Sequence, residues 1–198
     1  MKKSIIVLTV ILMMTLFSCG KNSHSDYSEI YESFSNIENY YATVEVTVKG
    51  NEGESKYKAR QYYVSPDLYR MDFVSEGMED VSCVLKGNRL YYKGPNGEIT
   101  EFDKYVPEEK YYIFLTDFME RYIKSETAKS VSKADETVLE LKESNEKPHR
   151  ASMKFYINNK NYEPKKLETY NDKGEKVIEA KFSGFKKNTK IDKKIFEL

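Results

Sequence analysis

Histidine and cysteine, the residues most used in zinc sites and nucleophilic catalysis, are scarce in this chain of 198 residues, which has only two histidines, His24 and His149, and two cysteines. Catalytic zinc needs three converging protein ligands, and a serine or cysteine nucleophile needs a base close by. The sequence contains no HExxH, GxSxG or glycine-rich phosphate-binding motif. It therefore argues against an enzyme and predicts no catalytic residue, metal site or cofactor.

The first eighteen residues have the layout of an export signal. Lys2 and Lys3 give a positive start, and Ile5 to Phe17 form an apolar run of 13 residues, which is too short for a comfortable membrane span. We therefore expect residues 1–18 to be a signal peptide that is removed, and the mature protein to act outside the cytoplasm.

The end of this segment adds a lipid anchor. The residues Leu16-Phe17-Ser18-Cys19 resemble the bacterial lipobox, in which cleavage leaves a cysteine at the new N-terminus. Only a thiol at this position gives the thioether that carries diacylglycerol. We expect Cys19 to be lipidated, residues 19–25 to form a short polar tether, and the protein to be held on a bacterial membrane. An ordinary secretory signal with an incidental cysteine is the alternative.

The mature chain reads as one globular domain, residues 26–198. Removing the signal takes away two lysines from 32 basic residues and leaves 32 acidic ones, a net charge of −2, which argues against a nucleic-acid partner. With Cys19 committed to lipid, Cys83 has no disulfide partner in the chain. Its place in the sequence VSCVL, on the same strand face as Val81 and Leu85, predicts a buried core thiol.

Apolar spacing predicts two helices. The first is expected to begin with Asp26 as its N-cap, and the second with Pro107 in its first turn. Each has an apolar stripe at intervals of three and four residues. The stripes are Tyr27, Ile30, Tyr31, Phe34 and Ile37 in the first helix, and Tyr111, Phe114, Leu115, Phe118, Met119 and Tyr122 in the second.

Alternation of apolar and polar residues predicts an antiparallel sheet over most of the remaining chain. The expected strands are 40–48, one around 57–63, 69–73, 81–86, 89–93, 137–142, 151–157, 165–170 and 177–185. A polar linker is expected at 127–135, and the apolar C-terminal residues are expected to tuck onto the fold's edge. The prediction is an α+β fold: a curved antiparallel sheet with both helices covering its concave face.

Three motifs, in order along the chain, resemble the LolA/LolB lipoprotein-carrier superfamily. They are Tyr62-Tyr63-Val64-Ser65-Pro66-Asp67-Leu68-Tyr69-Arg70, Tyr162-Glu163-Pro164-Lys165-Lys166-Leu167 and the terminal Ile191-Asp192-Lys193-Lys194-Ile195-Phe196. This resemblance implies a LolA-like half-barrel over most of the mature chain.

Within that superfamily, a lipidated member of this length that is rich in Lys, Glu and Tyr is similar to the GerS group of clostridial spore-germination lipoproteins. That resemblance implies a non-catalytic partner of a cell-wall N-acetylmuramoyl-L-alanine amidase. Such a partner supports formation of the muramic-δ-lactam of spore cortex peptidoglycan, which germination requires. In a spore former, the implied location is the forespore membranes.

Two function classes remain open from the residues: a protein-binding scaffold, and a carrier or receptor for a lipid or hydrophobic ligand on the concave face. Adjacent strand residues point to opposite faces, so in each tyrosine pair one ring points outward. Tyr41, Tyr62 and Tyr91 are therefore candidate protein-binding residues, with plain β-propensity as the alternative. Large inward side chains predict a filled core, which favours the scaffold. Edge strands rich in Lys and Glu would also permit a homodimer.

Overall fold

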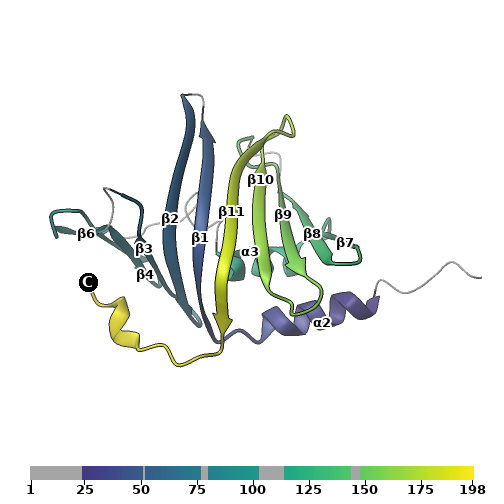
Figure 1. Ribbon diagram of the computed structural model, residues 1–198, viewed down its shortest axis with the longest axis horizontal. Coiled ribbons are helices and arrows are strands. Elements are labelled where there is room, and N and C mark those ends of the chain that lie inside the picture. Colours follow the sequence, from purple (N-terminus) through teal and green to yellow (C-terminus); the bar gives the residue numbers. More distant parts are fainter. Residues whose placement is uncertain (1–23, 51, 77–79, 103–113, 144–147) are drawn as a thin grey trace, which may run out of the picture.

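Eleven strands form one antiparallel sheet in the computed structural model, which describes residues 24–50, 52–76, 80–102, 114–143 and 148–198 (Figure 1). The first six strands are β1 (Asn39–Gly50), β2 (Gly53–Val64), β3 (Leu68–Phe73), β4 (Ser82–Lys86), β5 (Arg89–Lys93) and β6 (Ile99–Phe102). The last five are β7 (Lys129–Ser132), β8 (Glu136–Lys142), β9 (Ser152–Asn158), β10 (Pro164–Tyr170) and β11 (Lys176–Lys187).

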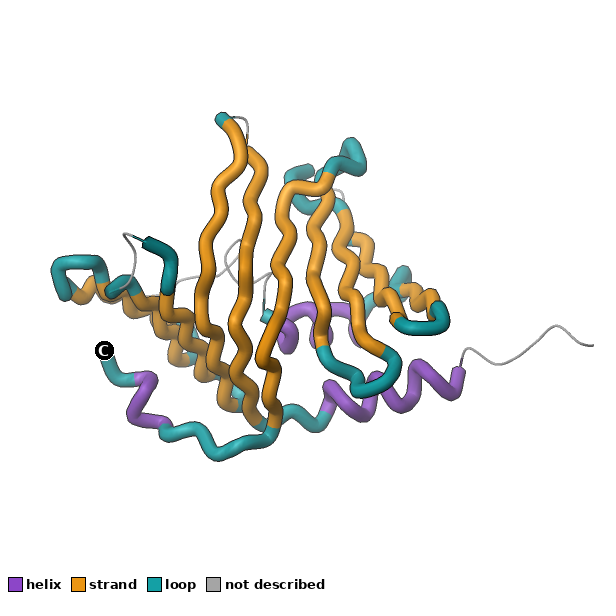
Figure 2. Tube along the Cα trace, in the orientation of Figure 1, coloured by secondary structure: helices purple, strands orange, loops and turns teal. Residues whose placement is uncertain are grey.

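The two halves of the sheet join at its centre. The spatial order is β6-β5-β4-β3-β2-β1-β11-β10-β9-β8-β7, so each half is a meander and β1 pairs with both β2 and β11. Val44 lies opposite Ala59 on one side and Phe182 on the other. In the described part of the chain, β6 and β7 remain at separate edges, so the curved sheet is an open half-barrel (Figure 2).

Strict alternation along β1 separates the two faces of the sheet. Tyr40, Ala42, Val44 and Val46 are at most 1% exposed and belong to the core cluster on the concave side. Their neighbours in sequence point to the convex side, which we call the outer face. Each large apolar side chain removed from water stabilises the fold by about 1.5 to 3 kcal/mol. The concave face is therefore the core of the protein.

Both helices pack against this core. They are α2 (His24–Ser35), along one end of the sheet, and α3 (Leu115–Lys124), behind it in Figure 1. In α3, Leu115, Phe118, Met119 and Tyr122 are buried at helical spacing. The ring of Phe155 on β9 lies 5.4 Å from that of Phe34 in α2 and 5.3 Å from that of Phe118 in α3. The predicted α+β half-barrel with helices on its concave face is confirmed.

The helix starts differ from the predictions. Helix α2 begins at His24, so Asp26 lies inside the first turn and is not the N-cap. Helix α3 begins at Leu115, because Phe114 has extended backbone angles (φ −85°, ψ 132°). A continuous helix starting at Pro107 is therefore wrong, and the expected stripe residue Tyr111 lies outside the described residues.

Two edge strands were missed. The segment 127–135, expected to be a polar linker, contains β7, and β6 lies where no strand was expected. Both strands are only four residues long, and Ile99, Phe102 and Val131 on them are about half exposed. A short strand whose side chains stay in solvent has little apolar alternation to reveal it.

The described part of the chain contains no helix that could span a membrane. Neither α2 nor α3 is long and apolar enough to cross a bilayer.

Replacing Phe155 with alanine should lower the free energy of unfolding by about 3–5 kcal/mol, because the cavity would separate both helices from the sheet. The measurement is urea denaturation. Phe102→Ala is the matched control, since that ring is 45% exposed on β6 and its loss should change stability by about 0.5 kcal/mol or less. Equal losses in the two variants would contradict this description of the core.

Candidate interaction surface

The three candidate tyrosines lie on one row across the outer face. Tyr41 on β1 is opposite Tyr62 on β2, and Tyr62 is opposite Arg70 on β3. Arg70 is opposite Val84 on β4, which is opposite Tyr91 on β5. Residues directly opposite each other on paired strands share a face. The prediction that all three rings point away from the core is therefore confirmed, while their role in binding stays a prediction.

Only two of the tyrosines form a pair. The ring centroids of Tyr41 and Tyr62 are 6.4 Å apart, and the Lys186 ammonium lies 5.8 Å from the Tyr41 ring. Both side chains are half-buried, which leaves part of each ring open to solvent. Tyr91 lies on β5, three strands beyond Tyr62 on β2, and donates a hydrogen bond of 3.3 Å to Glu101. The surface that we call the tyrosine pair is thus Tyr41 and Tyr62.

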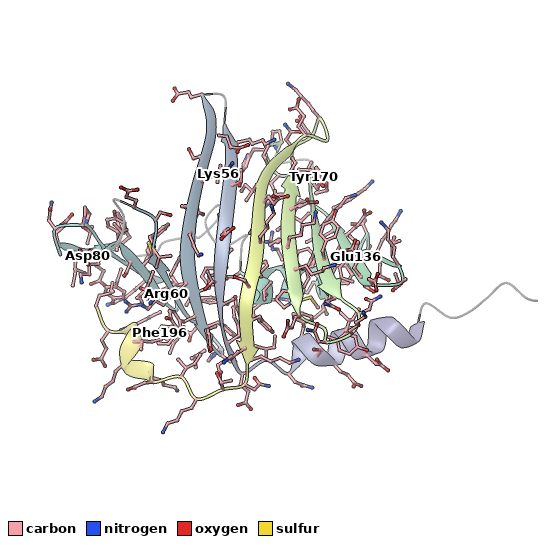
Figure 3. The ribbon with its side chains drawn as sticks, viewed as in Figure 1. Lys56, Arg60, Asp80, Glu136, Tyr170 and Phe196 are labelled. Atoms are coloured by element: carbon pink, nitrogen blue, oxygen red, sulfur yellow. The ribbon has the colours of Figure 1, made fainter. Side chains whose placement is uncertain are left out.

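The C-terminal segment 189–198 occupies the outer face between the tyrosine pair and Tyr91. It ends in the short 3-10 helix η3 (Lys193–Phe196), which contacts β3. Arg70 donates to the backbone carbonyl of Ile195 and, at 2.6 Å, to Asp72. Phe196 (Figure 3) and Val84 are buried, and neither belongs to the core cluster. The predicted tuck of the C-terminus is confirmed, with its place on the outer face instead of the edge.

Asn188 sets the start of this segment. Its backbone has a positive φ of 52°, a conformation that asparagine tolerates better than most residues. Its side chain accepts from the Glu38 amide at 2.9 Å and donates to the Asn36 carbonyl at 3.0 Å. These bonds fasten the end of β11 to the connection between α2 and β1. The sequence motif around Arg70 supported only a resemblance, so the role of this arginine was missed.

A second polar cluster on the outer face surrounds Glu168, which is 3% exposed although it faces away from the core. Its carboxylate accepts hydrogen bonds from the Lys166 ammonium at 2.7 Å, the Tyr170 hydroxyl at 2.7 Å and the Lys176 ammonium at 3.2 Å. The Lys166 ammonium also lies 4.1 Å from the centre of the Tyr156 ring. Sequence alternation predicted the strand at 165–170 but not this cluster.

These contacts fix the charge of Glu168. Burial alone would raise its pKa, but the hydrogen bonds from Lys166, Tyr170, Tyr156 and Lys176 outweigh burial and lower the pKa to about 2. Burial and the neighbouring Glu168 raise the pKa of Tyr170 to about 12. Both groups therefore keep one charge state at neutral pH, and the cluster is a hydrogen-bonded network of fixed charge.

The remaining candidates for chemistry do not converge. Cys83 packs partly buried against the core, opposite Met71 and Tyr92, as expected. His149 is exposed, whereas Cys19 and the side chain of His24 lie outside the described residues. Within the described ranges, no group of three His, Cys, Asp or Glu side chains could hold a metal ion. What the described residues offer is an aromatic and charged surface over a filled core.

Comparison with known proteins identifies the family. A family model described as "Sporulation protein YdcC-like" matches residues 1–196. The chain belongs to this YdcC-like family. No curated protein matches it significantly.

Solved structures share the fold of this YdcC-like protein at low identity. An uncharacterized conserved protein from Thermus thermophilus matches with a TM-score of 0.58 and 14% identity, covering 89% of this chain and 94% of that one. GerS, in the structure of the CwlD amidase from Clostridioides difficile in complex with the GerS lipoprotein, matches with a TM-score of 0.51 and 21% identity, covering 87% of this chain and 97% of that one. LolA superfamily protein NE2245 from Nitrosomonas europaea matches with a TM-score of 0.46 and 14% identity, covering 86% of this chain and 97% of that one.

Glu168→Gln should make the free energy of unfolding less dependent on pH in the acidic range. A carboxyl with a pKa of about 2 in the folded state and 4.5 ordinarily stabilises the fold above pH 4.5, and this contribution is lost as the pH falls toward 2. The variant should be less stable at neutral pH, and its free energy of unfolding should fall less steeply below about pH 5. Urea denaturation across this pH range is the measurement, and identical slopes for the two proteins would contradict the network.

Proposed function

We propose that the protein is a membrane-anchored, non-catalytic lipoprotein that binds a cell-wall N-acetylmuramoyl-L-alanine amidase. By doing so it supports formation of the muramic-δ-lactam of spore cortex peptidoglycan, which germination needs. The family supports the sporulation part of this proposal. The amidase part is supported by the fold that this chain shares with GerS, whose structure was solved in complex with the CwlD amidase.

The observation that carries the binding role is the contrast between the two faces of the sheet. The concave face is filled by the protein's own aromatic side chains, with Tyr40, Phe118 and Phe155 fully buried. The outer face presents the tyrosine pair beside Lys186. Tyrosine is enriched at protein interfaces because it buries a large area with few rotatable bonds to freeze. This contrast favours a partner on the outer face over a lipid carried on the concave face.

The expected lipid at Cys19 would place the protein at a membrane. The described chain begins at α2, so a short tether would hold the domain close to the outer surface of a membrane, in a spore former one of the forespore membranes. An anchor of this kind would keep the binding domain beside a cell-wall enzyme without itself doing chemistry.

Changing Tyr41 and Tyr62 together to alanine should weaken binding of the amidase by about tenfold or more, because aromatic anchors dominate protein interfaces. The measurement is recovery of the amidase with the tagged protein from sporulating cells, followed by titration of the purified pair. Tyr31→Ala is the matched control, since that ring is exposed on α2, away from the tyrosine pair. The proposal fails if the wild-type protein recovers no amidase and its deletion leaves cortex δ-lactam unchanged.

Cys19→Ala should abolish labelling of the protein by radioactive fatty acid and should leave residues 1–18 attached, because lipid attachment to the cysteine precedes cleavage of the signal. Labelling in growing cells and the intact mass of the protein report the two effects. Cys83→Ala should keep both the label and normal processing. An acylated Cys19→Ala protein in the membrane fraction would overturn the anchor.

A further inference from the structure

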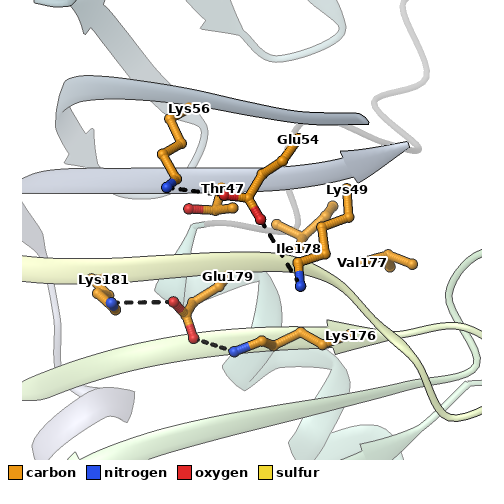
Figure 4. Close-up of a pocket in the computed structure, with 9 residues that line it drawn as sticks. All are labelled: Thr47, Lys49, Glu54, Lys56, Lys176, Val177, Ile178, Glu179 and Lys181. Carbon is orange, nitrogen blue, oxygen red and sulfur yellow. Dashed lines mark hydrogen bonds and ion pairs between the residues drawn. The ribbon is translucent and has the colours of Figure 1, made fainter. Parts of the chain in front are cut away.

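A pocket of about 210 Å³ opens on the outer face between the tip of the β1–β2 hairpin and β11 (Figure 4). The charged residues that line it are Lys49, Lys56, Lys176, Lys181, Glu54 and Glu179. They come from three strands that the sheet brings side by side, with Thr47 on the floor between them opposite both Lys56 and Glu179. No part of the tyrosine pair lines this pocket.

The pocket carries an excess of positive charge. Glu54 is shared by Lys56 at 2.9 Å and Lys49 at 3.9 Å. Glu179 is shared by Lys176 and, at 3.3 Å, by Lys181. Four ammonium groups therefore face two carboxylates. Lys176 also pairs with Glu168, and Glu168 pairs in turn with Lys166. Counting Glu168 and Lys166 adds one negative and one positive charge, so the excess of two positive charges does not change.

Both carboxylates stay ionised beside these lysines. The hydrogen bond from Lys56 lowers the pKa of Glu54, and the hydrogen bond from Lys176 lowers the pKa of Glu179. The local charge is thus +2 at neutral pH. Lysines confined to the rim of one concave site attract an anion more strongly than the same lysines spread over a flat surface.

The lysines are free to turn toward a ligand. The side chains of Lys49, Lys56 and Lys181 are 54%, 73% and 61% exposed, and among the described residues each pairs with one carboxylate. Such exposed pairs are weak, so an anion with more charge can replace them. All cations of the lining are lysines. A lysine ammonium acts as a compact point charge, which is a common way for a protein to bind phosphate.

We propose that this pocket binds the phosphate group of a phosphate ester. Lys56 and Lys181 contact its oxygens from opposite walls, and the Thr47 hydroxyl contacts it from the floor. The phosphate can come from a soluble or cell-wall ester or from a lipid headgroup, which present the same chemistry. The pocket lies at the end of the sheet opposite α2 (Figure 1), and this proposal does not depend on an amidase partner.

The test uses the purified mature protein in detergent at low ionic strength, with inorganic phosphate, glycerol 3-phosphate and dihexanoyl phosphatidylglycerol as probes in calorimetric titrations. Saturable binding is expected for at least one probe. The double variant Lys56→Gln/Lys181→Gln should weaken it by about tenfold or more, since each charge-assisted hydrogen bond contributes a factor of several. Binding should also weaken as sodium chloride is raised, because exposed charges are screened.

Lys142→Gln is the matched control. This lysine is exposed on the outer face of β8 and does not line the pocket. If the protein binds glycerol 3-phosphate and only the double variant loses this binding, the ligand is a soluble or cell-wall ester. If the protein binds only phosphatidylglycerol and only the double variant loses this binding, the ligand is a lipid headgroup. Absence of saturable binding for all three probes, or equal weakening by the control, overturns the proposal. Because both changed lysines are exposed, an unchanged circular dichroism spectrum will separate lost binding from lost folding.

Discussion

The pairing of β1 with β11 is the constraint on which the rest of the structure depends. It joins residues far apart in the chain, such as Tyr40 with Lys187, and makes one sheet from two meanders. Without it, each meander would have an additional open edge and β1 would lose half of its hydrogen bonds. The same pairing brings the end of β11 beside the connection from α2. There Asn188 turns the chain and directs the C-terminal segment across the outer face to Arg70.

The open topology also decides which face is available for binding. Since β6 and β7 lie at opposite edges, the chain between them has to cross from one side of the half-barrel to the other, and α3 lies on that path. Its buried aromatic stripe then fills the concave face together with Phe155. Because its own helix covers the concave side, the sheet leaves mainly the outer face for a partner, and this is the face on which the proposed partner would bind.

Sequence patterns predicted the elements that bury a complete face and missed those that do not. Strand β1 and helix α3 have an unambiguous period because the core demands an apolar residue at every inward position. Strands β6 and β7 are short and exposed, so they lack such a period. At the candidate site too, sequence predicted some features and missed others. Alternation could place Tyr41, Tyr62 and Tyr91 on the outer face. It could not reveal that Arg70 holds the C-terminal segment between them, because the register of β2, β3 and β4 sets that contact.

The tyrosine pair and the lysine pocket lie on the same strands of the outer face. Tyr41 and Thr47 are six residues apart on β1, which corresponds to about 20 Å along an extended strand. An interface of ordinary size covers roughly 800 Å² on each partner and is therefore about 30 Å across. A protein centred on the tyrosine pair would extend about 15 Å along β1, far enough to reach Lys181 on the rim of the pocket, which lies opposite Glu45, four residues from Tyr41. The exposed lysines there would add a salt-dependent attraction for an acidic partner, and a phosphate in the pocket would weaken it. A ligand of the pocket would therefore change the affinity of a partner that binds the tyrosine pair.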